Sequence, residues 1–459
     1  MGRQQFSVDG RQVVVVGAAR SGVAAAELLA KRGAFVTLTE SRASFDAADR
    51  LREHGVMLEL GGHKPATLAK ADLIVVSPGV PLDQPVFDEA RGNDVETIGE
   101  LELASRWLEG RIVAITGTKG KSTTTTLVGR VLKAAGAPVL VGGNIGVPLS
   151  AQVEESTPET IHVVEVSSFQ LETTTSFHPW VAAWLNFADD HLDRHATVDE
   201  YAQAKTRIFV NQTADDWAVI NADDPVVVKQ SSASAARRLR FSLQGTIADG
   251  FIVDEDWIVR RDGNDVERLV PLEAVELPGR HMLNNVLAAT AIATAAGARP
   301  QHVVEALKGF RGLEHVMEPV AEIGGVHFVN DSKATNVEAA QRSIESFERR
   351  VIAIVGGRYK GGDFGELAEP LVAHAGQVVA IGEAAPLVRE ALSGEVPVMV
   401  AGSMREAVER AYEAAKPDGV VLLAPACSSF DWFSDYAARG RAFKDEVARL
   451  KGAPVQEKN

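Results

Sequence analysis

Short apolar runs that end in glycine or in polar residues recur along this chain. One run, at residues 112–115, leads into the octapeptide TGTKGKST, and another, at residues 326–329, leads into the heptapeptide NDSKATN. Strands that alternate with helices predict a parallel, doubly wound sheet. In such a sheet, ligands bind where the strands end. The sequence therefore predicts an α/β protein with polar binding sites at the carboxyl ends of its strands.

The length of the chain, 459 residues, exceeds what one hydrophobic core holds. We predict a Rossmann-like domain over residues 1–99, a central P-loop-type ATPase α/β domain with a β insertion over residues 100–312, and a Rossmann-like C-terminal domain over residues 313–459. The insertion is expected at residues 237–277, because short alternations of polar and apolar residues indicate antiparallel strands. The C-terminal domain shows five strand-like runs, at residues 326–330, 351–356, 378–382, 398–401 and 420–424.

The composition disfavours several kinds of partner. The formal net charge is −15 and no long basic block offsets it, so neither nucleic acid nor a membrane surface is expected as a partner. The chain shows no signal pattern at its start and no apolar run of the ~18 residues that a membrane-spanning helix needs. Its single cysteine, Cys427, excludes an internal disulfide and fits a reducing compartment. We therefore expect a cytoplasmic protein, with Cys427 as a buried structural thiol.

The octapeptide at residues 116–123 predicts a phosphate-binding loop, although its spacing departs from the common one. The common loop has four residues between its first glycine and Gly-Lys-Ser/Thr, and the position of that first glycine is Ile115 here. Glycines let backbone N–H groups approach phosphate oxygens, and a helix N-terminus favours anions. Lys121 would neutralise the outer phosphates, and the Ser122 hydroxyl would contact Mg²⁺. The alternative is a glycine-rich connection with solvent-facing lysines.

A second glycine turn, GAARSG at residues 17–22, is a weaker signal. It resembles a dinucleotide fingerprint, with Glu40 near the expected acidic position. However, Ala19 replaces the middle glycine, which restricts the approach of a pyrophosphate. An NAD-dependent oxidoreductase is thus disfavoured but stays an alternative. A plain tight turn in a structural unit explains these residues equally well.

A metal site is predicted in the central domain. Glu165 lies near the end of an apolar strand, where a carboxylate is costly unless it faces a cation. The heptapeptide DDHLDRH at residues 189–195 follows another strand end and offers further ligands. Mg²⁺ that is bound to ATP takes one or two protein carboxylates together with waters and phosphates. The alternative is a solvated loop that is held by salt bridges.

Taken together, these segments resemble the Mur ligase family. The resemblance rests on TGTKGKST, on DHLDRH with Tyr201 and Lys205 downstream, and on NDSKATN, and it spans essentially the whole chain. The SKATN run, with LAPACSSFD at residues 423–431, is most similar to members that add glutamate. The resemblance implies a UDP-binding N-terminal domain, a central ATPase domain and a C-terminal domain that closes over the site. It also implies ATP-dependent joining of D-glutamate to UDP-N-acetylmuramoyl-L-alanine through an acyl phosphate, in peptidoglycan precursor synthesis. We expect the protein to be a monomer.

The resemblance further implies a role for each matching residue. ATP would contact Gly117, Thr118, Lys119, Gly120, Lys121, Ser122, Thr123, Asn285 and Asp331. Magnesium would be held by Ser122, Glu165, His191 and Lys205, with Lys205 carbamylated. The catalytic set would be Lys121, His191, Lys205 and Lys333. The UDP-linked substrate would contact Ser21, Ser41, Arg42, Ser77 and Asn144, and glutamate would contact Thr335, Lys360 and Ser429, with Tyr436 against the substrate.

Two positions depart from the family pattern. Met282 stands where an Asn is usual, between the retained His281 and Asn285, and Val316 stands where an Arg is usual. Both concern contacts with adenine and ribose and leave the phosphate chemistry intact. Other readings stay open: a different Mur-type or folylpolyglutamate-like amide ligase, an L-glutamate-adding variant, or a non-catalytic nucleotide-sensing scaffold.

Overall fold

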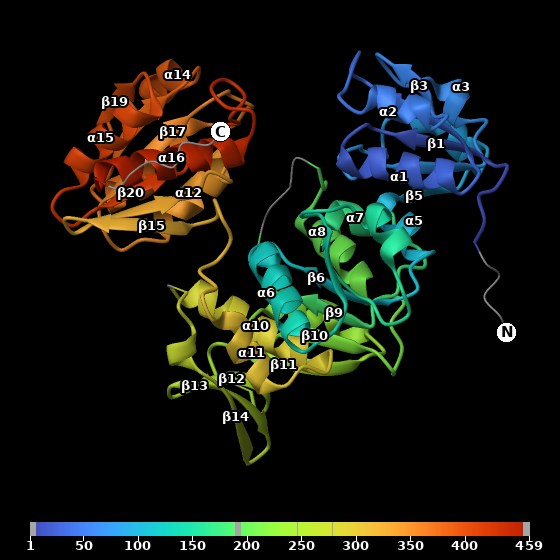
Figure 1. Ribbon diagram of the computed structural model, residues 1–459, viewed down its shortest axis with the longest axis horizontal. Coiled ribbons are helices and arrows are strands. Elements are labelled where there is room, and N and C mark those ends of the chain that lie inside the picture. Colours follow the sequence, from blue (N-terminus) through green and yellow to red (C-terminus); the bar gives the residue numbers. More distant parts are fainter. Residues whose placement is uncertain (1–5, 189–193, 246, 278, 453–459) are drawn as a thin grey trace. The chain divides into compact units, whose positions relative to one another are not determined.

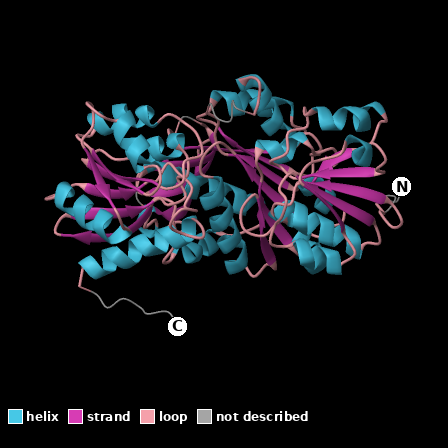
Figure 2. Ribbon diagram, turned by 90° about the horizontal axis from the view of Figure 1, so that it is seen from above, coloured by secondary structure: helices cyan, strands magenta, loops and turns pink. Residues whose placement is uncertain are grey.

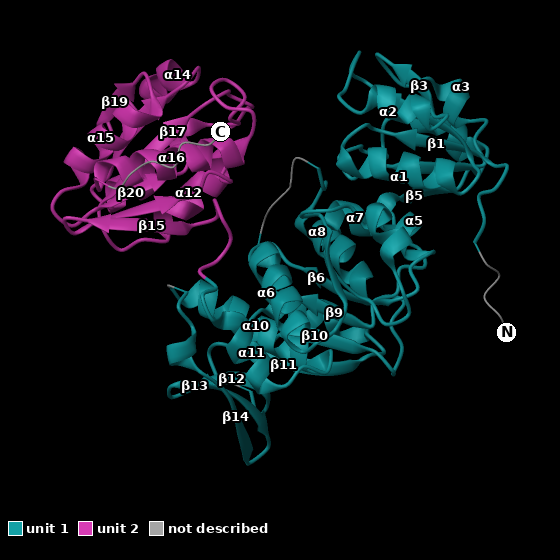
Figure 3. Cartoon of the chain, viewed as in Figure 1, with its two compact units in different colours: residues 1–310 teal, residues 311–459 magenta. Residues whose placement is uncertain are grey.

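The computed structural model describes residues 6–188, 194–245, 247–277 and 279–452 (Figure 1). The described chain contains three sheets, and helices flank the strands (Figure 2). The chain divides into two compact units, residues 1–310 and residues 311–459, which we call unit 1 and unit 2 (Figure 3). The division of the first 310 residues at position 99 stays a prediction, since both parts belong to unit 1. No described helix is both long enough and apolar enough to cross a bilayer.

The first sheet is wholly parallel and has the order β3-β2-β1-β4-β5. Its strands are β1 (Gln12–Val16), β2 (Phe35–Glu40), β3 (Met57–Leu60), β4 (Leu73–Val76) and β5 (Thr97–Gly99). Its helices are α1 (Arg20–Lys31), α2 (Ala48–Glu53), α3 (Pro65–Leu68) and α4 (Asp88–Gly92). Successive valines of β1 belong to two different buried clusters, one on each face of the sheet. This arrangement is the doubly wound one that the apolar runs predict.

The central sheet has nine strands in the order β14-β13-β12-β11-β10-β9-β6-β8-β7. They are β6 (Arg111–Thr116), β7 (Val139–Gly143), β8 (Ile161–Glu165), β9 (Val181–Trp184), β10 (Trp217–Asn221), β11 (Arg237–Ser242), β12 (Asp249–Asp254), β13 (Trp257–Asp262) and β14 (Asp265–Pro271). The helices of this part are α5 (Glu100–Ser105), α6 (Lys121–Ala134), α7 (Ser168–Glu172), α8 (Val198–Thr206), α9 (Pro225–Gln230), α10 (Arg280–Ala295) and α11 (Pro300–Leu307). The phosphate-loop strand β6 lies between β9 and β8.

The predicted β insertion at residues 237–277 extends this sheet and is only partly antiparallel. The strands β12, β13 and β14 pair in antiparallel fashion, as expected. By contrast, β11 pairs in parallel with β10 and, at its end, with β12. Phe241 of β11 and Phe251 of β12 are fully buried in the same apolar cluster as α10. The exposed arginines of β11 make its sequence look like that of a solvent-exposed strand, so the burial of its last residues was not predicted.

Unit 2 contains a six-stranded sheet in the order β15-β16-β20-β17-β18-β19. Its strands are β15 (Glu318–Ile323), β16 (Val326–Asn330), β17 (Val351–Gly356), β18 (Gln377–Ile381), β19 (Val398–Ala401) and β20 (Val420–Leu423). Its helices are α12 (Val337–Glu345), α13 (Ala368–Ala373), α14 (Ala385–Ala391), α15 (Met404–Ala415) and α16 (Tyr436–Leu450). All five expected strands are present. The antiparallel edge strand β15 was not predicted, because Pro319 and the two glutamates Glu318 and Glu322 interrupt its apolar pattern.

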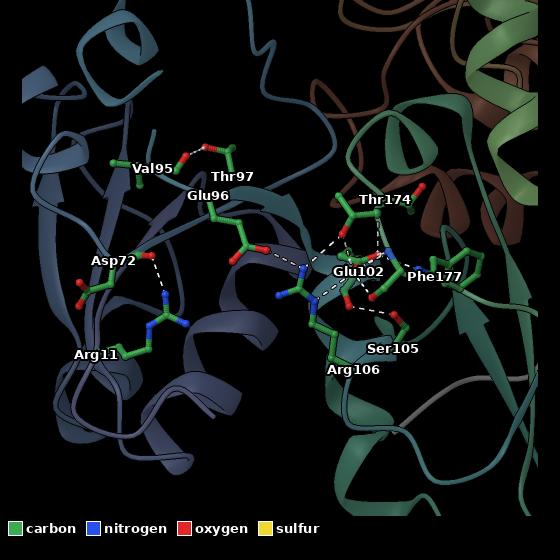
Figure 4. Close-up of polar contacts among 12 residues, drawn as sticks. Arg11, Asp72, Val95, Glu96, Thr97, Glu102, Ser105, Arg106, Thr174 and Phe177 are labelled. Carbon is green, nitrogen blue, oxygen red and sulfur yellow. Dashed lines mark hydrogen bonds and ion pairs between the residues drawn. The ribbon is translucent and has the colours of Figure 1, made fainter. Parts of the chain in front are cut away.

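A buried carboxylate ties the first sheet to the central part of unit 1 (Figure 4). Glu102 of α5 is fully buried, and Arg106 Nε donates to its carboxylate over 3.0 Å. Three consecutive backbone N–H groups also donate to this carboxylate, those of Thr175, Ser176 and Phe177. Arg106 in turn pairs with Glu96 beside β5 over 2.7 Å. These contacts set the path of α5, which carries the chain from the first sheet into the central one.

Candidate active site

The predicted phosphate-binding loop lies between β6 and α6, as expected. Gly120 has a left-handed conformation (φ +78°) at the N-cap of α6. A Cβ at this position would lie 2.2 Å from Asn285 Oδ1, so both conformation and space require glycine. The first backbone N–H groups of α6 face the loop without a helical partner. The loop therefore presents a helix N-terminus, to which anions bind favourably.

The side chain of Asn186 fastens this loop, and our sequence reasoning did not single it out. Asn186 Oδ1 accepts hydrogen bonds from the backbone N–H groups of Thr118 (3.1 Å) and Lys119 (2.8 Å). Asn186 Nδ2 donates to Lys119 O over 3.0 Å. The residue follows β9, the strand beside β6. Its position directly after a buried strand is the only sequence signal that would have pointed to it.

Two predicted catalytic lysines meet at one carbonyl oxygen of the loop. Lys121 Nζ donates to Gly117 O over 2.9 Å, and Lys205 Nζ donates to the same atom over 2.9 Å. Lys205 comes from α8 and is almost wholly buried, with Nζ 4.7 Å from the centre of the Tyr201 ring. The Tyr201 hydroxyl lies 3.3 Å from Thr118 Oγ1. The fold thus brings two lysine Nζ atoms together at the predicted phosphate-binding loop.

Glu165 lies at the carboxyl end of β8, beside this loop. It is 2% exposed, and its register partners are Ile115 of β6 and Gly143 of β7. Asn144 Nδ2 donates to Glu165 Oε1 over 2.8 Å. The other oxygen, Oε2, is buried and has no hydrogen-bond partner among the described residues. A buried carboxylate oxygen without a partner is costly, and a bound cation would satisfy it.

The other predicted metal ligands are less completely placed. The candidate His191, with its neighbours 189–193, lies outside the described residues. Ser122 is half-buried in the first turn of α6, and the next residue, Thr123, is buried. Within the described ranges no group of three or more His, Cys, Asp or Glu side chains is positioned to hold a metal. The predicted ligand set therefore stays a prediction.

The start of α10 contributes the predicted adenine side of the loop. Asn285 is buried, and its Nδ2 lies 3.8 Å from the sulfur of Met282, the residue that departs from the family pattern. Burial lowers the pKa of His281, and the nearby Lys119 cation lowers it further. The substitution at Met282 thus leaves the amide of Asn285 against a thioether, which is a weak acceptor.

The glycine turn at residues 17–22 lies against the carboxylate of Glu40, whose oxygens already accept hydrogen bonds from the chain itself. Glu40 Oε2 accepts from Ala18 N over 2.7 Å and from Arg42 Nη2 over 3.1 Å, and Glu40 Oε1 accepts from Ser41 Oγ. Burial raises the pKa of Glu40, but the hydrogen bonds from Arg42, Ala18 and Ser41 outweigh it and lower this pKa to about 2. Glu40 is thus an ionised anchor of the turn. This engagement does not favour the dinucleotide reading, in which the same carboxylate would receive a ribose hydroxyl.

The predicted contacts with the UDP-linked substrate surround this turn. Ser77 is buried and donates to Gly17 O over 3.0 Å, whereas Ser21 is half-buried in the first turn of α1. An open cavity of about 880 Å³ lies beside the turn, and Arg20 and Arg42 are among its lining residues. Arg20 Nη1 also donates to Gly146 O over 3.1 Å. The loop that carries Asn144 therefore lies next to the glycine turn at residues 17–22 within unit 1.

In unit 2, the predicted residues lie on loops after three neighbouring strands, β16, β20 and β17. Asp331 follows β16 and is 6% exposed. Its Oδ1 accepts from Met317 N over 3.2 Å, and its Oδ2 accepts from the Ser343 hydroxyl. Burial raises the pKa of Asp331, and these hydrogen bonds together with Lys333 partly oppose that rise. Asp331 is thus held inside unit 2, while the Lys333 side chain is exposed.

The predicted glutamate contacts come together in part. Lys360 Nζ lies 3.5 Å from Thr335 Oγ1, so the loops after β17 and β16 meet there. Ser429 is 2% exposed in the loop after β20, and Tyr436 is 41% exposed at the start of α16. The neighbouring Cys427 is fully buried, and burial raises the pKa of its thiol to about 11, which confirms the buried thiol expected there.

Comparison with known proteins matches all three parts of the chain. Residues 11–99 match the Mur ligase MurD-like N-terminal domain, residues 115–293 the Mur ligase middle domain, and residues 317–427 the Mur ligase glutamate ligase domain. The UDP-N-acetylmuramoylalanine--D-glutamate ligase of Acidobacterium capsulatum is 45% identical over 98% of this chain and 98% of its own length. The ligase of the same name from Desulfosudis oleivorans is 43% identical over 96% of this chain and 97% of its own length.

The chain belongs to the Mur ligase family.

Solved structures of other Mur ligases share the fold. The pseudomurein peptide ligase type C of Methanothermus fervidus matches with a TM-score of 0.57 and 18% identity, over 96% of this chain and all of that one. The UDP-N-acetylmuramate-alanine ligase of Thermotoga maritima matches with a TM-score of 0.56 and 20% identity, over 96% of this chain and 99% of that one. At these identities the likeness concerns the fold, and it confirms the predicted three-domain α/β Mur ligase architecture.

Proposed function

We propose that this Mur ligase adds D-glutamate to UDP-N-acetylmuramoyl-L-alanine and converts ATP to ADP and phosphate, as a step of peptidoglycan precursor synthesis. The relatives of that name, which match nearly the whole chain, support the choice of substrates. The observation that carries the chemistry is the meeting of Lys121 Nζ and Lys205 Nζ at Gly117 O. The Lys121 cation at the N-terminus of α6 suits a triphosphate, and the shared contact fixes Lys205 Nζ beside it.

The reaction needs ATP because a carboxylate oxygen is a poor leaving group. Phosphorylation of the L-alanine carboxylate gives an acyl phosphate, and the neutral amine of glutamate attacks its carbonyl carbon. The tetrahedral adduct then expels phosphate as the amide forms. Since the first step brings two anions together, Lys121 and Lys333 would act by positioning and by electrostatic stabilisation.

We further propose that magnesium binds beside the loop. The buried Oε2 of Glu165, which has no hydrogen-bond partner within the described chain, is suited to such a cation. Ser122, His191 and Lys205 would complete the protein ligands. When bound, Mg²⁺ would screen the repulsion between the phosphates of ATP and the substrate carboxylate. Asn144 would hold Glu165 in place through the 2.8 Å hydrogen bond.

We also propose that Lys205 is carbamylated. Burial next to a second cation favours the neutral amine of a lysine, and the neutral amine is the form that reacts with CO₂. The product is an anion, and it would relieve the repulsion between Lys205 and Lys121. The lysine is 1% exposed and is held by Gly117 O, so its terminal atom is fixed at the loop.

The remaining contacts would divide between the two units. Unit 1 would bind ATP through Gly117, Thr118, Lys119, Gly120, Lys121, Ser122, Thr123 and Asn285, and the UDP-linked substrate through Ser21, Ser41, Arg42, Ser77 and Asn144. Unit 2 would supply Asp331 and Lys333 toward the nucleotide, and Thr335, Lys360, Ser429 and Tyr436 toward glutamate. We expect a cytoplasmic monomer, because the reaction consumes ATP and one chain carries every proposed contact. Light scattering would test the monomer.

Phosphate release with purified protein, Mg²⁺, ATP and UDP-N-acetylmuramoyl-L-alanine tests the proposal. We expect D-glutamate to stimulate release, and L-glutamate and other amino acids to have little effect. Stimulation by L-glutamate alone would favour an L-glutamate-adding ligase, and stimulation by another amino acid a different Mur-type ligase. ATP that stays intact with every amine would overturn the proposal. Nicotinamide absorbance in the same mixture tests the oxidoreductase alternative.

A further inference from the structure

A buried guanidinium lies behind the glutamate-binding loops of unit 2. Arg439, in the first turns of α16, is 1% exposed. Its Nε donates to Ser332 Oγ over 3.0 Å, its Nη2 to Ser332 O over 2.9 Å, and its Nη1 to Cys427 O over 3.1 Å. One side chain thus joins the loop after β16 to the loop after β20. A guanidinium suits this task because its planar fork fixes several acceptors at once.

The residues joined by Arg439 stand next to the proposed substrate contacts. Ser332 directly precedes Lys333, and Cys427 is two residues before Ser429. Ser332 Oγ also donates to Tyr436 O over 2.7 Å, which attaches the start of α16 to the same point. The hydroxyl of Ser332 therefore accepts a hydrogen bond from the side chain of Arg439 and donates one to the backbone of Tyr436 in the same turn of α16. Three chain segments that carry proposed contacts are fixed by two buried side chains.

The loop after β17 packs against the same point. A Cβ at Gly357 would lie 3.1 Å from Arg439 Nη1 and 2.2 Å from Ser428 O, so the backbone there approaches as closely as glycine permits. Arg358 N donates to Ser428 O over 2.9 Å, and Lys360 follows two residues later. Any shift of the guanidinium would therefore be transmitted to the loop that carries Lys360 as well.

Among the described residues, no ion pair neutralises the charge of Arg439. In the described part of the chain its hydrogen-bond acceptors are two carbonyl groups and one hydroxyl, and no carboxylate pairs with it. Burial lowers its pKa to about 10, although Cys427 and Asp431 oppose that shift. Arg439 is still a cation at pH 7. A buried charge that lacks a counterion is costly, and an apolar residue would fill the space at a lower cost.

We propose that Arg439 is a positioning residue of the glutamate-binding site. Its buried guanidinium holds the loops after β16 and β20 and the start of α16 in the relative positions that bind the two carboxylates of the incoming glutamate. This inference rests on the proposed function, because it assigns these loops to glutamate. Arg439 itself is too buried to touch the substrate. Its positive charge adds to the attraction that Lys360 exerts on the two carboxylates.

The test is the kinetics of Arg439→Lys, which retains a cation and removes the fork. We expect the KM for D-glutamate to rise at least ~10-fold, because a misplacement of ~1 Å has effects of this order or larger. The KM for UDP-N-acetylmuramoyl-L-alanine should change less than ~2-fold, since its proposed contacts lie in unit 1. Ser332→Ala, a milder change that removes the shared hydroxyl, should raise the glutamate KM in the same direction and decides the question if Arg439→Lys does not fold.

Arg350→Lys is the matched control. Arg350 also lies in unit 2 and donates to backbone carbonyls, those of Ala415 and Lys416, but it precedes the amino end of β17, whereas the proposed glutamate contacts follow the carboxyl ends of the strands. We expect its glutamate KM to equal that of the wild type. Equal glutamate KM values for wild type, Ser332→Ala and any folded Arg439→Lys would overturn the inference, as would an equal rise in Arg350→Lys. A wild type that releases no phosphate with either glutamate enantiomer would overturn the proposed function itself.

Discussion

Single residues of the phosphate-binding loop carry most of the proposed chemistry. Gly117 O receives both Lys121 Nζ and Lys205 Nζ, and Asn186 holds the loop backbone in place. The glycines and Lys121 were predictable, because they stand in one short motif after an apolar strand. The family resemblance placed Lys205 in the same site as Lys121. The role of Asn186 and the contact of Lys205 with Gly117 O were not predictable, since these residues lie 68 and 88 positions from their partners in the loop.

Removal of one loop cation should impair catalysis far more than it impairs folding. We expect Lys121→Ala to lower kcat at least ~100-fold, the order of loss that follows removal of one charge-stabilising donor. Lys133→Ala is the control, because Lys133 is exposed near the other end of α6 and should retain wild-type turnover. Coupled phosphate release measures both variants. Near-normal turnover of Lys121→Ala would exclude this role for the loop lysine.

A carbamate on Lys205 predicts chemical rescue. We expect Lys205→Ala to lose most of its activity and to regain part of it when acetate or propionate is added, because a short acid can replace the lost anionic group. Lys121→Ala should not respond to these acids, since it lacks a cation. Phosphate release over a range of acid concentrations is the measurement. A flat response of Lys205→Ala would count against the carbamate.

At the scale of elements, strand ends and helix starts set the positions of the functional groups. In the central sheet, β6, β8 and β9 lie side by side, so the phosphate loop, Glu165 and Asn186 share one edge. The apolar runs predicted most of these strands. They did not predict β15 or the parallel pairing of β11, because an edge strand and a strand with one polar face both lack a continuous apolar run.

The hydrogen bonds that the segment after α7 donates to Glu102 should contribute to the stability of the fold. Burial raises the pKa of Glu102, but hydrogen bonds from Ser176, Thr175 and Arg106 outweigh it, and the net pKa lies below the ordinary 4.5. We expect Glu102→Gln to lower the free energy of unfolding by at least about 2 kcal/mol at pH 7, because it removes a buried, hydrogen-bonded charge. Urea denaturation measures this difference.

The pH dependence follows from the same shift. An unfolded glutamate has its ordinary pKa, so the stability that ionised Glu102 contributes is complete above about pH 4.5 and is lost as the pH falls toward the lower folded pKa. The difference between wild type and Glu102→Gln should therefore be constant near neutral pH and shrink in acid. Glu154→Gln, which removes an exposed ion pair with Arg32, should have a much smaller effect. A difference that is independent of pH down to pH 3 would contradict the assignment.

At the scale of the whole molecule, the described chain consists of two units with separate cores. Alternate residues of β6 in unit 1 and of β17 in unit 2 enter different buried clusters on the two faces of each sheet. The proposed ATP contacts lie mainly in unit 1, and the proposed glutamate contacts lie in unit 2. Each unit should therefore fold alone, and neither should complete the reaction alone.

Separate expression of the two units tests this division. We expect residues 1–310 to unfold cooperatively and to bind ATP, but to release no phosphate in response to glutamate. Addition of residues 311–459 at micromolar concentration should restore little activity, because the covalent link supplies an effective concentration of the order of mM. Circular dichroism, ATP titration and phosphate release make the comparison with the intact chain. Glutamate-dependent turnover by residues 1–310 alone would contradict the assignment of glutamate to unit 2.

The sequence by itself determined the class of fold, the position of the glycine- and lysine-rich loop between β6 and α6, and the family, because each depends on residues that are close together in the chain. Apolar runs, glycines and lysines at fixed spacing have the same physical meaning in any fold that contains them. Only the tertiary structure decided which distant groups share an atom or a loop: Lys205 with Lys121, Asn186 with the loop backbone, and Arg439 with Ser332. Such pairings follow from sheet order and helix packing, which bring residues together regardless of their separation in sequence.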